Sequence, residues 1–180
     1  MLRLTFIAMS ALLLLGSSFA GFAQGPAVPA FIKPAHAEVL RKWMRRHPEY
    51  RVATESDCRC DEDLARIRTK SEGAWKAVPN YQPYYVEGDF NWDRAKDFAV
   101  GIVKGERPSQ FRLAVFHGPF GPEHSGRAAF LSDPMPLGQA FFFGDPRPHP
   151  QMLVVGPFES EGGALRPTKT GYVWDYGEDK

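Results

Sequence analysis

Apolar positions recur with a helical period in two segments of the N-terminal half. The first, over residues 35–46, carries an apolar stripe beside basic residues and is predicted to be an amphipathic helix. It should end before His47 and Pro48, because a proline disfavours the helical conformation of the residue before it. The second, over residues 61–69, begins with three acidic residues that suit the positive end of a helix dipole. The stripe of the first helix consists of Val39, Leu40, Trp43 and Met44.

From about residue 84 onward, short runs of β-branched and aromatic residues alternate with Gly, Pro, Asp and Ser. The connections between the runs are too short for helical crossovers, so an antiparallel meander is predicted. With one or two N-terminal helices packed on one face, this gives an α+β fold of about six to seven strands. The predicted strands cover residues 84–87, 98–103, 111–116, 127–131, 139–143, 152–155 and 171–174.

The first 23 residues have the pattern of a cleavable secretory signal peptide. Arg3 precedes an apolar run that breaks at Gly16, leaving roughly 12 apolar residues where a membrane-spanning helix needs about 20. Small residues at Gly21 and Ala23 favour cleavage before Gln24. The mature protein is therefore expected to be periplasmic or extracellular, with no membrane anchor after cleavage. An uncleaved N-terminal anchor is the alternative.

Charge and length limit the remaining possibilities. The chain has 22 basic and 21 acidic residues, and its net charge falls from +1 to zero once residues 1–23, with Arg3, are removed. Such a balance argues against a nucleic-acid partner. Residues 24–34 are rich in Pro, Ala and Gly and are predicted to form a flexible lead-in. Residues 35–180 then form a single globular domain, long enough to bury about two thirds of its unfolded surface.

One acidic segment has the spacing of a cation-binding loop. Between Gly88 and Phe98, oxygen-bearing side chains occupy relative positions 1, 3, 5 and 9, directly before an apolar strand. Calcium binds about six to eight oxygens, and alternating positions on a tight loop can point several of them inward. The candidate ligands are the side chains of Asp89, Asn91, Asp93 and Asp97 and the backbone carbonyl of Ala95.

This segment resembles the calcium loop of the FG-GAP and VCBS families, whose pattern is DxDxDGxxD with a preceding Gly and a following strand. The likeness covers residues 86–100, and the motif occurs once, so a repeated propeller is not implied. The resemblance implies a structural Ca2+ ion that joins the two flanking strands. Arg94 replaces the family's glycine at position 6, where a positive φ costs a non-glycine residue about 1–2 kcal/mol. The alternative is a metal-free turn in which Asp89 and Asn91 hydrogen-bond the loop backbone.

The two cysteines, Cys58 and Cys60, flank Arg59 among acidic residues. In an oxidising compartment paired cysteines usually form a disulfide. A local staple is the preferred interpretation, because the neighbouring carboxylates disfavour thiolate chemistry. A redox-active pair and a soft-metal clip remain open, whereas two cysteines exclude a four-sulfur zinc site.

Histidines in the Gly- and Pro-rich loops offer the residue types of a zinc hydrolase. These are His117, Glu123 and His124, with His149 further along the chain. Their spacing fits no helical motif that places two histidines on one face, and the intervening Gly-Pro pairs interrupt a regular helix. Ordinary solvated loop histidines are the preferred interpretation.

Aromatic residues make up 13% of the chain. They include Tyr81, Tyr84, Tyr85, Trp92 and the run of phenylalanines at 141–143. Such residues can build a platform for a glycan or a peptide, but filling the core is the preferred interpretation.

Two functional hypotheses follow. The preferred one is an exported noncatalytic module, stabilised by one calcium ion, that binds a protein or a glycan. The alternative is a small periplasmic metal-dependent hydrolase that uses the loop histidines. The first is preferred because no nucleophile, base and orienting residue occur at a recognisable spacing.

Overall fold

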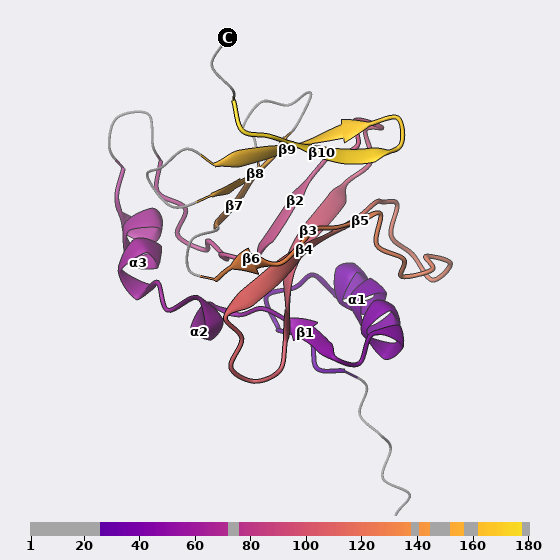
Figure 1. Ribbon diagram of the computed structural model, residues 1–180, viewed down its shortest axis with the longest axis horizontal. Helices are drawn as coiled ribbons and strands as arrows, with labels where there is room; N and C mark the ends of the chain where they lie inside the picture. The colour runs from indigo at the N-terminus through magenta and orange to yellow at the C-terminus, as the bar shows by residue number, and fades with distance from the viewer. Residues whose placement is uncertain (1–25, 72–75, 138–140, 145–151, 157–161, 178–180) are drawn as a thin grey trace, which may run out of the picture.

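The computed structural model describes residues 26–71, 76–137, 141–144, 152–156 and 162–177. Within these ranges the chain forms three helices and ten strands, and the strands make two antiparallel sheets. Figure 1 shows the larger sheet in the middle of the molecule, with helix α1 on one side and the smaller sheet on the other. The α+β fold class predicted from the sequence is confirmed.

The larger sheet, sheet A, is built around one long hairpin. β3 (Asp97–Lys104) pairs with β4 (Gln110–Phe116) over six residue pairs. The outer edge of β3 is shared by β1 (Tyr50–Val52) and β2 (Tyr85–Gly88), each of which covers about half of it. The outer edge of β4 is shared in the same way by β5 (Phe130–Leu131) and β6 (Met135–Pro136).

Gly101 lies where β1 and β2 meet along β3. Its carbonyl accepts the amide of Ala53 and its own amide donates to the carbonyl of Tyr84, both at 2.9 Å. A Cβ at this position would lie 2.9 Å from the Cβ of Tyr84. Glycine is therefore required here by the close approach of Tyr84 to the strand.

The smaller sheet, sheet B, contains the C-terminal strands in the order β10-β9-β8-β7. All three of its pairings are antiparallel among the residues that the structure describes. Its strands are β7 (Phe141–Gly144), β8 (Leu153–Gly156), β9 (Gly163–Thr168) and β10 (Gly171–Asp175).

Sheet A is buried on both faces. Alternate residues of a strand point to opposite faces, so the apolar run of β3 divides between two hydrophobic cores. Phe98, Val100 and Ile102 join the core beneath α1. Ala99 and Val103 join the core between the two sheets. Each large side chain buried in this way contributes about 1.5–3 kcal/mol relative to an exposed one.

The helices are divided between these two cores. α1 (Pro34–Arg46) buries its predicted apolar stripe against sheet A, and its two last-turn arginines suit the negative end of the helix dipole. α3 (Asp61–Thr69) packs Leu64 and Ile67 into the core between the sheets. Figure 1 shows α3 at the flank of the two sheets, away from α1.

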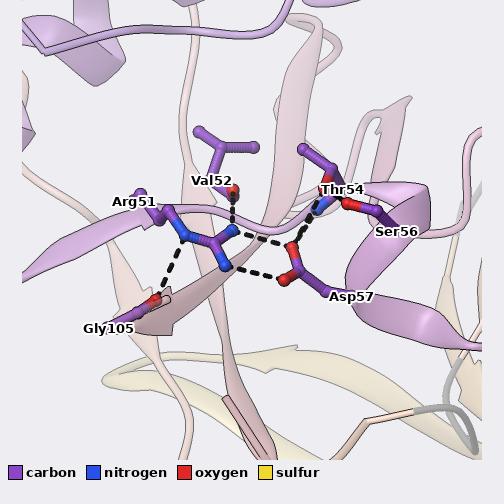
Figure 2. Close-up of polar contacts among 6 residues, drawn as sticks. All are labelled: Arg51, Val52, Thr54, Ser56, Asp57 and Gly105. Atoms are coloured by element: carbon purple, nitrogen blue, oxygen red, sulfur yellow. Dashed lines mark hydrogen bonds and ion pairs between the residues drawn. The ribbon is translucent and has the colours of Figure 1, made fainter. Parts of the chain in front are cut away.

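A polar network holds the short helix α2 (Glu55–Cys58) beside strand β1. The guanidinium of Arg51 donates two hydrogen bonds of 2.7 Å to the carboxylate of Asp57 and a further one to the carbonyl of Gly105 (Figure 2). Asp57 also accepts the amide and the hydroxyl of Thr54, which caps the helix. Burial by itself raises the pKa of Asp57, but the bonds from Arg51 and Thr54 outweigh it and hold the pKa below its ordinary value.

Both predicted helices are found, at residues 34–46 and 61–69, and the predicted strands match β2, β3, β4, β8 and β10 closely. The structure adds α2, β1, β6 and β9 and arranges the strands in two sheets. Within the predicted strand 127–131 only Phe130–Leu131 pairs. The prediction of a strand over residues 139–143 falls partly on residues 138–140, which lie outside the described residues, as does the predicted signal peptide. In the predicted lead-in, Ile32 is buried in the core beneath α1.

Candidate functional site

The loop of residues 89–97 connects the end of β2 to the start of β3, and it folds around Asp97. This carboxylate is fully buried, with an exposed fraction of 0%. Its Oδ2 accepts the amides of Phe90 and Asn91 at 2.9 and 3.2 Å. Its Oδ1 accepts the amide of Gly118 at 3.0 Å, which ties a second loop to the first. Burial raises the pKa of Asp97, and these hydrogen bonds offset that effect only in part.

The other acidic side chains of the loop also accept backbone amides. Asp89, which is buried, accepts the amide of Arg94 on Oδ2 at 3.0 Å. Asp93, which is exposed, accepts the amide of Ala95 on Oδ1 at 2.7 Å and the side-chain amide of Asn91 on Oδ2 at 2.7 Å. Every predicted side-chain ligand therefore takes part in shaping the turn, as Asp and Asn do in Asx turns.

Two residues of the loop adopt left-handed backbone conformations. Trp92 has φ of 65° and Arg94 has φ of 74°. The sharp turn that the family pattern assigns to glycine at position 6 is thus present here with arginine in its place. Such a conformation costs a non-glycine residue about 1–2 kcal/mol, which the hydrogen bonds to Asp89 and Asp97 help to offset.

The candidate ligands differ in how they are placed. Asp89 and Asp97 are buried, Asn91 and Ala95 are half-buried, and Asp93 faces solvent. As they stand, no three His, Cys, Asp or Glu side chains of the described residues gather into a group that could hold a metal ion. The predicted ligand set also contains the side chain of Asn91 and the backbone carbonyl of Ala95, which are not among those four residue types.

Sheet B meets the segment after β4 through Tyr172 of β10. The hydroxyl of Tyr172 lies 2.6 Å from Nε2 of His117. Burial raises the pKa of Tyr172, and so do the nearby carboxylates of Asp97, Asp93 and Asp89. The tyrosine hydroxyl is thus within electrostatic reach of the acidic loop, a juxtaposition that no sequence pattern indicated because Tyr172 lies in the other sheet.

Gly118 allows the loop after β4 to approach this site closely. A Cβ on Gly118 would lie 2.3 Å from the carbonyl oxygen of Lys96. Because Gly118 has no side chain, its amide can approach and bond Asp97, and the preceding residue, His117, then lies beside Tyr172.

Of the histidines in the hydrolase hypothesis, His117 lies beside the hydroxyl of Tyr172, and His124 has backbone partners. Nδ1 of His124 accepts the amide of Gly126 at 3.0 Å, so its Nε2 carries the proton and donates to the carbonyl of His117 at 3.0 Å. Both ring nitrogens of His124 are thereby engaged in holding the loop. Glu123 is exposed, and His149 lies outside the described residues.

Cys58 and Cys60 are joined as a disulfide, with their Cα atoms 5.2 Å apart. Both residues are buried in the core between the sheets. Arg59, between them, has a left-handed φ of 54°. The bridge thus closes the turn between α2 and α3.

A second buried polar cluster surrounds His36 of α1. Its Nδ1 lies 2.7 Å from the hydroxyl of Tyr85, which donates to Glu87 at 3.3 Å, and Lys33 also bonds Glu87. The imidazole stacks on Phe98 at 4.3 Å between ring centroids. Burial lowers the pKa of His36, Glu87 opposes that change and Lys33 adds to it. No sequence pattern indicated a role for His36, since one histidine in an amphipathic helix carries no signal.

Comparison with known proteins finds no matching family model, no matching curated protein and no matching solved structure. None of the helices in the described part of the chain has the length and apolar character needed to cross a bilayer.

Proposed function

We propose that this protein is an exported, noncatalytic interaction module whose loop of residues 89–97 binds one structural calcium ion. The observation that supports it is the backbone of the loop. Arg94 has φ of 74° at the position where the calcium-loop pattern has glycine, and its amide bonds Asp89 Oδ2. The loop therefore has the turn that such a site requires, although the glycine itself is missing.

The donor set suits a hard cation. Three carboxylates, one amide oxygen and one backbone carbonyl are all oxygen ligands, which calcium prefers and softer metals do not. Asp89 and Asp97 are already buried beside the turn. Binding then requires the exposed Asp93 to exchange its bond with Asn91 for the ion.

Calcium at this position would act on stability. Gly88 pairs with Asp97 at the end of the β2–β3 ladder that the loop closes. An ion held by both ends of the loop opposes fraying of the ladder. At a free calcium concentration about a hundredfold above Kd, it would add about 2.7 kcal/mol to the free energy of unfolding.

Thermal unfolding in millimolar calcium and in chelator tests the proposal. For a domain of this size, the expected stabilisation raises Tm by about 5–10 °C. Asp93→Asn should remove most of the shift while the metal-free Tm stays nearly unchanged. Asp133→Asn, at another exposed aspartate, is the matched control and should keep the full shift. An identical Tm with calcium and with chelator would contradict the calcium site.

The noncatalytic part of the proposal has its own test. The protein is loaded with zinc and assayed on small chromogenic esters, with and without chelator. We expect no hydrolysis above that of the free metal. Chelator-sensitive hydrolysis that is lost in His124→Ala would overturn the proposal in favour of a hydrolase.

A further inference from the structure

Two open grooves lie beside the end of α1 and beside the turn between β3 and β4. The first, called here the helix groove, has a volume of about 440 Å³ and lies between the end of α1 and β5. Ala128 and the exposed Leu131 give it apolar surface, whereas Trp43, which also lines it, is buried. Its basic lining residues are Arg46, His47 and Arg127.

The second, called here the hairpin groove, lies beside the turn between β3 and β4 and has a volume of about 370 Å³. Its apolar surface comes from Tyr50, Pro108 and Pro134, because Ile102 and Phe111, which also line it, are buried. Its cationic lining residues are Lys104, Arg107 and Arg112.

The two grooves are neighbours. The ring of Tyr50 in the hairpin groove lies 5.5 Å, between centroids, from that of Trp43 in the helix groove. On the other side, Arg112 donates to the carbonyl of Ser132 at 2.8 Å, and Ser132 directly follows Leu131 of the helix groove. One extended ligand can therefore contact both.

The lining of the grooves is strongly one-sided in charge. Neither groove is lined by an aspartate or a glutamate among the described residues. Glu49 pairs with Lys104 at 3.8 Å on the surface nearby, so this lysine is partly neutralised. Arg107 and Arg127 are exposed, and no ion pair within the described part of the chain involves either of them. The basic stripe, as these residues are called below, consists of Arg46, His47, Lys104, Arg107, Arg112 and Arg127.

The lining selects among anionic ligands. Arginine recognises carboxylates through planar paired hydrogen bonds. The apolar walls favour side chains such as leucine or phenylalanine over the hydroxyls of a glycan. A glycan would need an exposed aromatic face for stacking, but Trp43 is only 3% exposed, and the ammonium group of Lys104 lies over the Tyr50 ring, 4.6 Å from its centroid. A polypeptide that carries acidic and apolar side chains fits both properties.

We propose that the basic stripe binds an acidic segment of a partner protein, with apolar side chains of that segment seated in the two grooves. This inference rests on the interaction role proposed above and narrows its partner from a protein or glycan to an acidic polypeptide. It does not involve the calcium loop, which lies at the opposite end of strand β3 from the β3–β4 turn. Each of the two proposals can therefore be contradicted without affecting the other.

Fluorescence anisotropy with labelled peptides tests the stripe on the full mature chain. The probes are a ten-residue peptide of alternating Glu and Phe, its Lys and Phe counterpart, and a peptide of Glu and Ser. We expect the Glu and Phe peptide to bind at least tenfold more tightly than the other two. Binding should weaken as salt is raised, because exposed charges are screened. Repeating the titration in calcium and in chelator should give the same affinity.

Charge reversal identifies the surface. The double variant Arg107→Glu with Arg127→Glu should weaken binding of the acidic peptide at least tenfold. Lys169→Glu, at an exposed lysine in the turn between β9 and β10, is the matched control and should change affinity less than twofold. Circular dichroism of each variant checks that the fold is retained.

Several results would overturn the proposal. One is equal binding of acidic and basic peptides, and another is equal weakening by the double variant and by Lys169→Glu. Stripe-dependent binding of polygalacturonate or of phosphatidylglycerol vesicles, without binding of the acidic peptide, would assign the surface to a glycan or a lipid instead. If the acidic peptide does not bind but calcium still raises Tm, only the proposal for the basic stripe is contradicted. If the peptide binds but calcium leaves Tm unchanged, only the proposal for the calcium loop is contradicted.

Discussion

Asp97 offers a direct test of how the loop is held together. Its buried carboxylate accepts three backbone amides, from Phe90, Asn91 and Gly118. These bonds stabilise the charged carboxylate, whereas its burial disfavours the charge. Burial is the larger effect, so the pKa of Asp97 is raised. The stability effect of a substitution here therefore depends on which is larger, the lost hydrogen bonds or the relieved burial of charge.

Two substitutions separate these contributions. Asp97→Ala removes both acceptor oxygens, and each of the three amides, if left buried without a partner, costs about 1–3 kcal/mol. Relief of the buried charge offsets part of that sum, so we expect a net loss of about 3–5 kcal/mol. Asp97→Asn keeps one oxygen, which can serve either the two amides at Oδ2 or the one at Oδ1. Its NH2 group must then face an amide donor, and we expect a loss of about 1–3 kcal/mol.

Urea unfolding of the mature chain in chelator gives these values without any contribution from calcium. Fluorescence of the tryptophans and circular dichroism should report the same transition if unfolding is two-state. Asp133→Asn, at an exposed residue, should lie within about 0.5 kcal/mol of the wild type.

An Asp97→Asn variant as stable as the wild type, or more stable, would mean that charge burial outweighs the lost bonds. The acidic side chain would then be retained for a purpose other than stability. An alanine variant no less stable than the asparagine variant would also contradict these expected losses, because the three amides would then not depend on this acceptor.

Three further predictions concern other parts of the chain. Gly101→Ala should destabilise the fold by about 1–3 kcal/mol, because its Cβ would lie 2.9 Å from that of Tyr84. Gly121→Ala, with no atom within 4 Å of the added Cβ, is the control in the same urea assay. Burial lowers the pKa of His36 from its ordinary value of 6.5. The unfolded chain then binds this proton more readily than the folded protein does. The free energy of unfolding should therefore fall as pH drops below about 6.5 and level off below the pKa of the folded state. The variant His36→Gln, measured by urea unfolding across this pH range, should flatten that profile. Expression with an intact export system should yield a mature protein that begins at Gln24, as N-terminal sequencing can check; a chain still starting at Met1 would contradict the signal-peptide interpretation.

Local pattern was sufficient for the elements whose signals are contained in a few neighbouring residues. The stripe of Val39, Leu40, Trp43 and Met44 predicted α1, and the acidic start at Asp61 predicted α3. The loop of residues 89–97 was also found from spacing alone, since its turn-forming hydrogen bonds join residues no more than seven apart.

Short elements escaped prediction because their stability comes from distant partners. β1 has three residues and exists through its pairing with β3, about fifty positions further along the chain. α2 spans four residues and is held by Arg51 and the capping residue Thr54. A capping pattern from Thr54 to Asp57 was the one local signal that could have revealed it.

Patterns among neighbouring residues specify the type of each strongly patterned element, the α+β class and the acidic loop before Phe98. Long-range packing specifies that the strands form two sheets and that Tyr172 meets His117 beside Asp97. It also brings basic residues that are scattered along a nearly neutral chain into the lining of two adjacent grooves. The reason is physical. Periodicity and turn chemistry act between residues close in the chain, whereas the pairing of sheets and the gathering of charge depend on contacts between residues far apart in it.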